Sequence, residues 1–160
     1  MLAQNQLVAQ LRQRSPVGVA GHWTDGWDGY PAARQRMVDA MVEYRLPNPV
    51  LIGGDIHSFW ATDLKADFGN PLSKTVATEF VGTSVTSDGP PYERFKEMLL
   101  ENPHVRFFES RHRGYVLCEA TPQRFEAHFR AISDRRNKNA SLSTLARFVV
   151  ENGKPGATQA

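Results

Sequence analysis

The stretch VLIGGDIH at residues 50–57 decides how the rest of the chain can fold. Its first three residues form a continuous apolar run, bounded by Pro49 on one side and by Gly53 and Gly54 on the other. Such a run is typical of a strand buried on both faces, which is an inner strand of a covered sheet. We therefore predict that residues 50–52 form a central strand, parallel to a neighbour.

The segments on either side of this strand predict a mixed α/β domain. Residues 31–46 begin with a proline, carry apolar residues at helical spacing and stop at Pro47. A second helix is expected to start at residues 88–91. Strands are predicted at residues 74–81, 105–108, 114–120, 124–132 and 143–150, the last as an edge strand.

The two ends of the chain have a different texture. Residues 1–14 are polar, with Leu2, Leu7, Val8 and Leu11 as an apolar stripe, and we predict a weak helix there. This start is abrupt, as in a chain cut from a longer one. We therefore divide the chain into a truncated N-terminal segment at 1–20, a main domain at 21–152 and a polar tail at 153–160.

The composition excludes several classes of protein. Nineteen Lys and Arg against 17 Asp and Glu give a net charge of +2, which is too balanced to indicate a nucleic-acid or membrane-surface partner. No stretch approaches the length of a membrane helix, and the first 16 residues do not resemble a signal peptide. Cys118 is the only cysteine, so an internal disulfide is impossible, and we expect it to be buried and inert.

The residues after the predicted strand carry the chemistry. Asp55 and His57 are two residues apart, so in an extended segment they would point to the same side. Ligand sites in α/β sheets lie beyond the carboxyl ends of strands, and a carboxylate beside an imidazole suits a metal ion. The other interpretation is a helix-capping aspartate next to a hydrogen-bonded histidine.

Four motifs resemble the PhoD-like phosphatase family. They occur in the order of that family and extend over residues 25–156. The motifs are WDGYPAAR at 27–34, GDIHS at 54–58 followed by WATDL at 60–64, EFVGTSVTS at 79–87, and NPHVR at 102–106 continuing to Tyr115.

The resemblance implies a fold and an activity. It implies part of a metallophosphoesterase-like sandwich: a mixed sheet with helices packed on it and antiparallel C-terminal strands. Family members hydrolyse phosphate monoesters and diesters, commonly with calcium and iron, and are commonly secreted or periplasmic. Asp55 would be a metal ligand and His57 would lie in the same site, so both are candidate catalytic residues.

The resemblance also implies that part of the site lies elsewhere. In the family, a long region before WDGYPAAR contributes the first strands of the sheet and further metal ligands. A hard cation such as calcium takes about 6–8 oxygen ligands, which Asp55 and His57 cannot supply. We expect this missing N-terminal half as a partner, in cis or in trans, and little activity without it.

Three further residues are candidates for binding a phosphate ester. Ser84 follows a predicted strand, although the chemistry of a turn explains it nearly as well. Arg111 and Arg113 lie between two predicted strands, where a guanidinium could clamp a phosphate. A solvated hairpin turn is the competing interpretation.

Other polar residues are assigned more plainly. Asp25, Trp27 and Asp28 belong to a glycine-rich loop and suit either a pocket or packing with helix capping. The histidines away from the metal motif are taken as structural or surface residues: His22, His104 and His128. The alternative to an enzyme part is a non-catalytic α/β remnant or module that binds a metal or a partner protein; a nucleic-acid binder is the least supported.

Overall fold

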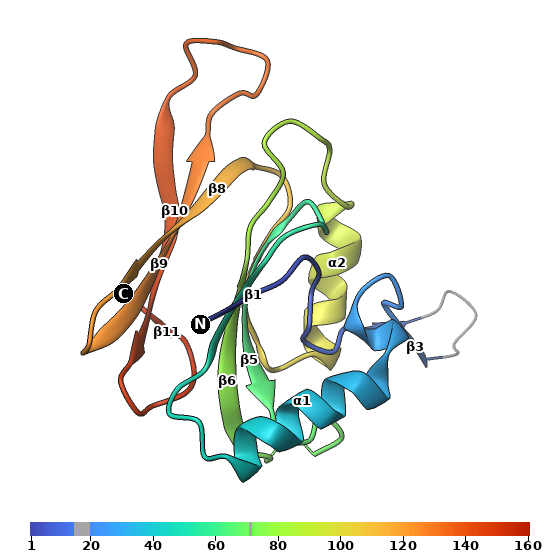
Figure 1. The fold of residues 1–160 in the computed structure, drawn as a ribbon. Coiled ribbons are helices and arrows are strands. Elements are labelled where there is room, and N and C mark those ends of the chain that lie inside the picture. The colour runs from blue at the N-terminus through green and yellow to red at the C-terminus, as the bar shows by residue number, and fades with distance from the viewer. Residues whose placement is uncertain (15–19, 71) are drawn as a thin grey trace.

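The computed structural model describes residues 1–14, 20–70 and 72–160, and two β-sheets packed face to face dominate it (Figure 1). The first sheet is mixed, and the second is antiparallel. The first has the order β1 (Leu2–Ala3), β4 (Val50–Gly53), β6 (Thr75–Val81), β5 (Phe59–Lys65) and β7 (Val105–Glu109). The second has the order β11 (Thr158–Gln159), β10 (Leu142–Glu151), β9 (Arg124–Ile132) and β8 (Arg113–Ala120).

Strand β4 occupies the position that its sequence predicts. It lies between β1 and β6 and is parallel to both, with Leu51 opposite Leu2 on one side and Glu79 on the other. Leu51 is fully buried because helices cover one face of this sheet and the second sheet covers the other. The prediction of a buried, parallel inner strand is confirmed.

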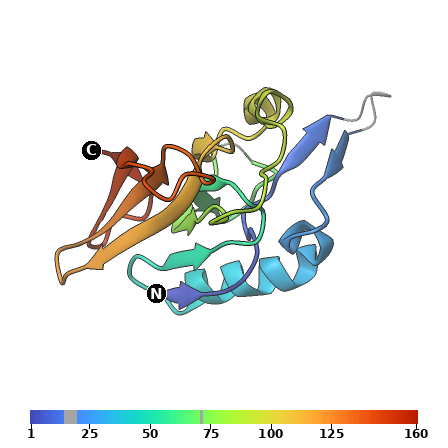
Figure 2. The same ribbon diagram turned by 90° about the horizontal axis from the view of Figure 1, so that it is seen from above.

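Two helices cover the outer face of the first sheet. Helix α1 (Pro31–Glu43) starts at its proline and ends three residues before the predicted boundary, and α2 (Tyr92–Met98) follows the predicted start at residues 88–91. Figures 1 and 2 show both helices on the side of the first sheet away from the second. Met41 of α1 and Phe95 and Met98 of α2 belong to one core, in which the rings of Trp60 and Phe95 meet edge to face at 6.2 Å.

The second core fills the space between the two sheets. Side chains alternate along a strand, so Phe80 of β6 points into this core while its neighbours Glu79 and Val81 point toward the helices. Phe80 packs against Phe129 of β9 and Phe148 of β10, with ring centroids 6.2 and 6.4 Å apart. The sandwich thus has a layer of helices, a mixed sheet and an antiparallel sheet.

The N-terminal prediction is wrong. Residues 1–14 form no helix: they contain β1, an irregular stretch and β2 (Arg12–Arg14), which pairs with β3 (Ala20–His22). Leu2 is 43% exposed, whereas Leu7, Val8 and Leu11 are buried. Their apolar pattern fits an irregular segment sunk into the core as well as it fits a helix, so periodicity alone could not decide.

The C-terminal part follows the prediction with one correction. Residues 143–150 do form a strand, but β10 is not the edge strand, because the short β11 from the polar tail pairs with it at Phe148 and Val149.

Strand β5 of the first sheet was not predicted. The short turns η1 (Trp27–Gly29) and η2 (Leu99–Glu101) complete the described elements. No helix in the described ranges is long and apolar enough to cross a membrane.

Candidate functional site

Three loops meet at one edge of the first sheet. Strands β4, β6 and β7 run in the same direction, because β4 pairs parallel with β6, and both β6 and β7 pair antiparallel with β5. Their carboxyl ends therefore open on one side, at the top of Figure 1. We call the loops that follow them, residues 54–58, 82–91 and 110–112, the site edge. This is where the topology of an α/β sheet places ligands.

Asp55 and His57 are exposed on the site edge, but not as an extended pair. Their backbones have positive φ angles of 72° and 55°, so the expectation of an extended segment with both side chains on one side is wrong. The strand ends at Gly53, and Ile56 N–H then bonds back to Gly54 O at 2.9 Å. Left-handed conformations cost about 1–3 kcal/mol each and cluster at functional sites, which makes two within three residues a functional signal.

The ring of His57 is held by a backbone carbonyl. Its Nδ1 lies 3.0 Å from the carbonyl oxygen of Asp88, which can only accept a hydrogen bond. Nδ1 therefore carries the proton, and in the neutral ring the lone pair is on Nε2. Histidines that ligate metals donate their second ring nitrogen in this way, because the bond fixes the tautomer and the orientation of the ring.

The described residues do not by themselves make a metal site. Among them, no group of three or more His, Cys, Asp and Glu side chains is placed to hold an ion. The oxygen of Asp55 and the nitrogen of His57 have the donor chemistry for a metal, and the fixed tautomer of His57 fits that role. A complete coordination shell requires ligands from outside these residues.

Arg113 and Ser84 lie together beneath the site edge. Arg113 is 5% exposed and its Nη1 donates to the carbonyls of His57 at 3.1 Å and Ser87 at 2.6 Å and to Ser84 Oγ at 2.8 Å. Ser84 Oγ in turn donates to the Ser87 carbonyl at 2.6 Å. Both residues join the loop after β4 to the loop after β6, so they shape the candidate site from behind.

Arg111 lies nearby in a different environment. Its guanidinium forms a two-point contact with Glu109, with Nη2 to Oε2 at 2.6 Å, and its Cζ stacks 3.8 Å from the centre of the Tyr92 ring. Although burial opposes it, the hydrogen bonds from Arg111 hold the pKa of Glu109 below its usual value. Residues 110–112 connect strands of two different sheets, so the expected hairpin turn is wrong.

Arg135 was missed by the sequence reasoning. It lies in the β9–β10 loop, which extends beyond the sheets at the top of Figure 1. Its Nη2 pairs with Asp88 Oδ1 at 2.6 Å and its Nη1 donates to the Thr86 carbonyl at 2.6 Å. The only sequence signal for this residue was the pair of adjacent arginines 135 and 136. Its partner Asp88 is far away in the sequence, so the ion pair could not be predicted. Asp88 thus binds Arg135 through its side chain and His57 through its backbone carbonyl.

Comparison with known proteins identifies the family of this chain. The model of the PhoD-like phosphatase family matches residues 1–129. The chain belongs to the PhoD-like phosphatase family. It is 40% identical over 135 residues to alkaline phosphatase D of Bacillus subtilis (strain 168), a match that covers 82% of this chain and 23% of that protein.

A solved structure extends the likeness to the whole chain. The structure titled "Structure of PhoD" superposes with a TM-score of 0.85 at 34% identity, over 99% of this chain and 31% of that one. The mixed α/β sandwich predicted from the sequence is therefore the fold of this phosphatase family. The chain spans less than a third of the length of either relative.

Many polar residues of the PhoD-like motifs bind a buried segment instead of the site edge. This segment is residues 7–12, which we call the inner segment, and its apolar side chains are buried. From WDGYPAAR, Asp28 Oδ2 accepts from Leu11 N–H at 2.7 Å, and Arg34 donates to the Val8 carbonyl at 3.3 Å and pairs with Asp28. Asp28 does not cap α1, whose N-cap is Tyr30 without a side-chain hydrogen bond.

Glu79 holds the same segment from strand β6. It is fully buried, and its two oxygens accept from Val8 N–H at 2.7 Å and from Ala9 N–H at 3.0 Å. Thr62 Oγ donates to it as well, at 3.1 Å. Burial raises the pKa of Glu79 to about 7, against the opposing effect of these hydrogen bonds and of Arg34. Sequence reasoning missed Glu79, which belongs to the third motif.

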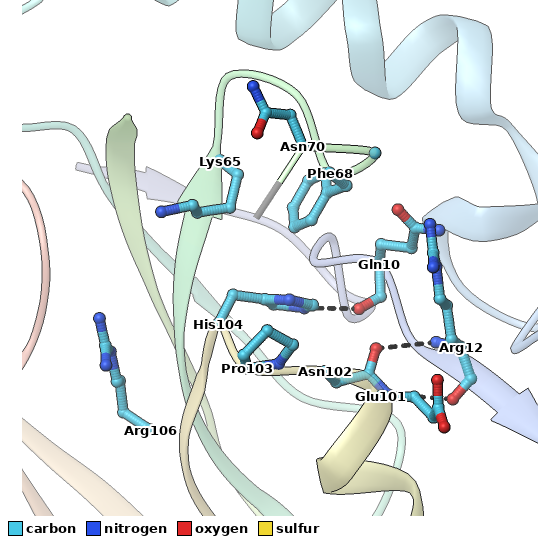
Figure 3. Close-up of a pocket in the computed structure, with 11 residues that line it drawn as sticks. Gln10, Arg12, Lys65, Phe68, Asn70, Glu101, Asn102, Pro103, His104 and Arg106 are labelled. Atoms are coloured by element: carbon cyan, nitrogen blue, oxygen red, sulfur yellow. Dashed lines mark hydrogen bonds between the residues drawn. The ribbon is translucent and has the colours of Figure 1, made fainter. Parts of the chain in front are cut away.

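The fourth motif completes the contacts of the inner segment (Figure 3). Its first residues precede β7, and the site edge follows that strand. Asn102 accepts from Arg12 N–H and donates to its carbonyl, both at 2.9 Å. His104 Nε2 donates to the Gln10 carbonyl at 2.7 Å, and burial lowers the pKa of this imidazole. His104 is therefore structural, as predicted, and the surrounding hollow of about 180 Å³ belongs to this packing.

Proposed function

We propose that this chain forms the C-terminal part of a metal-dependent phosphoesterase site that hydrolyses phosphate esters. Asp55 and His57 would be metal ligands and catalytic residues. One observation carries the proposal: His57 is exposed at the carboxyl edge of the sheet, with Nδ1 tied to the Asp88 carbonyl and Nε2 left for a ligand. Family membership supports the chemistry, and calcium and iron are the metals we propose.

A metal bound there would polarise phosphoryl oxygens and supply or orient the nucleophile. The residues of this chain have positioning roles in the proposal. Arg113 and Ser84 fix the loop of His57 against the loop after β6, and Arg135 fixes Asp88, to which His57 is bonded. Direct substrate contacts by Ser84, Arg111 and Arg113 stay a prediction.

The remaining ligands would come from the part of the phosphatase that precedes this region in longer relatives, in cis or in trans. The shortage of ligating side chains among the described residues supports this. We include secretion or a periplasmic location in the proposal. The alternative is a non-catalytic module that binds a metal or a partner protein. The small number of ligating side chains among the described residues supports it equally.

A graft tests the proposal against the alternative. The matching region of B. subtilis alkaline phosphatase D is replaced by residues 1–160, and hydrolysis of bis(p-nitrophenyl) phosphate is measured with calcium and iron. We expect activity that a chelator removes, and little or none from the 160-residue chain alone. A folded graft without activity would favour the non-catalytic module, and chelator-sensitive turnover by the chain alone would show that its ligand set is complete.

A further inference from the structure

A second cavity lies between the site edge and the β9–β10 loop. It has a volume of about 440 Å³ and is lined by residues 88–89, 110–113 and 132–136. Asp55, His57 and Ser84 do not line it. Gly89 forms the wall between this cavity and His57, because a Cβ on Gly89 would lie 2.6 Å from the carbonyl oxygens of both His57 and Ser110.

Ser110 lines this cavity, and its buried hydroxyl has no partner among the described residues. Ser110 is 4% exposed, and its Oγ makes no hydrogen bond to any described residue. Buried hydroxyls in folded proteins are nearly always bonded, so an unpaired one that lines a cavity indicates a group that completes it. The backbone carbonyl of Ser110 is already engaged by Arg113 Nη2.

Arg113 brings a buried positive charge to the same cavity. Its recorded partners are backbone carbonyls and the hydroxyl of Ser84, none of which carries a negative charge. Of its five N–H groups, Nε–H and one on Nη2 have no partner among the residues described here. Burial, and then the nearby Arg135, lower the pKa of this guanidinium, and the attraction of Asp88 and Glu109 offsets this only in part.

The carboxylates around the cavity bond to groups other than the Arg113 guanidinium. Four arginines and two aspartates line the space. Arg135 pairs with Asp88, and Arg111 pairs with Glu109, which lies just outside. Asp134 accepts from the backbone amide of Arg136 rather than from its guanidinium. Arginines therefore outnumber aspartates in the lining of the cavity; Arg113 is buried there and Arg136 is exposed.

We propose that this cavity binds a phosphate-type oxyanion through Ser110 Oγ, Arg113 and Arg136. An oxyanion there accepts from the hydroxyl once the Ser110 side chain turns toward it, places a negative charge beside the buried guanidinium and accepts from the remaining N–H groups of Arg113. Oxyanion binding in this cavity does not depend on hydrolysis at Asp55. Gly89 lies between the cavity and His57, so the cavity could hold a phosphate group of the substrate or product. This second role rests on the proposed function.

Nuclear magnetic resonance of the 160-residue chain tests the pocket without any metal. The ¹⁵N-labelled chain in EDTA is titrated at constant ionic strength with inorganic phosphate and, separately, with dimethyl phosphate. We expect saturable shifts of the amides of Gly89, Ser110 and Ser133. Saturation by both anions identifies a pocket open to esterified phosphate, and saturation by inorganic phosphate alone identifies a pocket for the free ion.

Variants separate this pocket from general surface charge. Ser110→Ala should weaken phosphate binding about tenfold, the effect of losing one hydrogen bond to a charged group, and Arg136→Ala should weaken it as well. Arg94→Ala, on the exposed face of α2, is the matched control and should bind normally.

The free energy of unfolding of each variant shows whether a loss of phosphate binding comes from misfolding. Ser110→Ala without phosphate should be at least as stable as the parent chain, because it removes an unpaired buried hydroxyl. Wild-type affinity in Ser110→Ala, absence of saturation, or an equal loss in Arg94→Ala would overturn the proposal. None of these outcomes depends on whether the grafted enzyme hydrolyses esters.

Discussion

The site edge and the inner segment use polar side chains in opposite ways. At the site edge, Asp55 and His57 are exposed on a strained loop, and arginines hold that loop from behind. At the inner segment, Glu79 and Arg34 are buried and saturate the backbone of a non-helical stretch. Residues of similar chemistry are thus exposed as candidate ligands at the site edge and buried as supports of the inner segment.

The difference explains why the PhoD-like motifs are rich in charged and polar residues. An irregular segment in a core has backbone N–H and C=O groups that no sheet satisfies, and each unpaired group is costly. Three of the four motifs send side chains to residues 7–12. A motif in a phosphatase is therefore not evidence by itself that its residues touch the substrate.

The first way to break this comparison is to remove the ligand chemistry and keep the fold. Asp55→Asn in the grafted enzyme should reduce hydrolysis by more than about 100-fold, the upper end for changes outside the metal shell. Asparagine tolerates the positive φ, and Asp55 is exposed, so the free energy of unfolding should change by less than about 0.5 kcal/mol. Asp39→Asn, exposed on α1, is the control. Retained activity would remove Asp55 from the site.

The second test removes the support of the inner segment. Glu79→Ala should lower the free energy of unfolding by about 3–5 kcal/mol, because Val8 N–H, Ala9 N–H and Thr62 Oγ lose their acceptor in a dry core. Urea unfolding of the 160-residue chain measures this, with the exposed Glu93→Ala as the control. A loss below about 1 kcal/mol would mean that the inner segment does not depend on Glu79.

The third test measures how the contribution of Glu79 to stability changes with pH. Glu79 has its pKa raised from 4.5 to about 7, so the folded chain binds more protons than the unfolded chain in this window. Its contribution to stability is therefore full below pH 4.5 and is lost as pH rises to 7. At about 1.4 kcal/mol per unit the change is about 3 kcal/mol.

Glu79→Gln isolates this effect from other titrating groups. His104, whose pKa is lowered, gives the opposite slope, because the unfolded chain binds its proton first and stability rises with pH. That slope is present in both proteins and cancels in their difference. The stability of the parent chain minus that of Glu79→Gln should fall between pH 4.5 and 7. A flat difference would contradict a titrating Glu79.

The sequence predicted local features well and distant pairings poorly. The apolar run at residues 50–52 located the central strand, and the glycine pair located the site edge after it. The left-handed turn of Asp55 and His57 could not be predicted, because it depends on bonds to the loop 31 residues away at Asp88. Glu79 sits in an alternating strand, where a charged residue normally indicates a solvated face. Only the packing of the inner segment shows otherwise.

The last test asks whether the two arginine-held loops act as one unit, and it has the smallest expected effect. Arg135 touches neither Asp55 nor His57, but it fixes Asp88 and Thr86, and Asp88 fixes Nδ1 of His57. Arg135→Ala in the grafted enzyme should therefore weaken metal binding by about tenfold, the lower end for outer partners of a ligand. The Asp88 side chain is 88% exposed, and exposed ion pairs contribute little to stability. The free energy of unfolding should therefore change little in Arg135→Ala.

The tautomer of His57 separates positioning from general damage. Ring ¹⁵N shifts of the metal-free 160-residue chain should show a protonated Nδ1 in the parent and in Arg94→Ala, and a mixture of tautomers in Arg135→Ala. Arg135→Lys, which can keep one of the two contacts, should lie between them. If Arg135→Ala lost metal affinity while the tautomer stayed fixed, Arg135 would act on the site by its charge and not through Asp88.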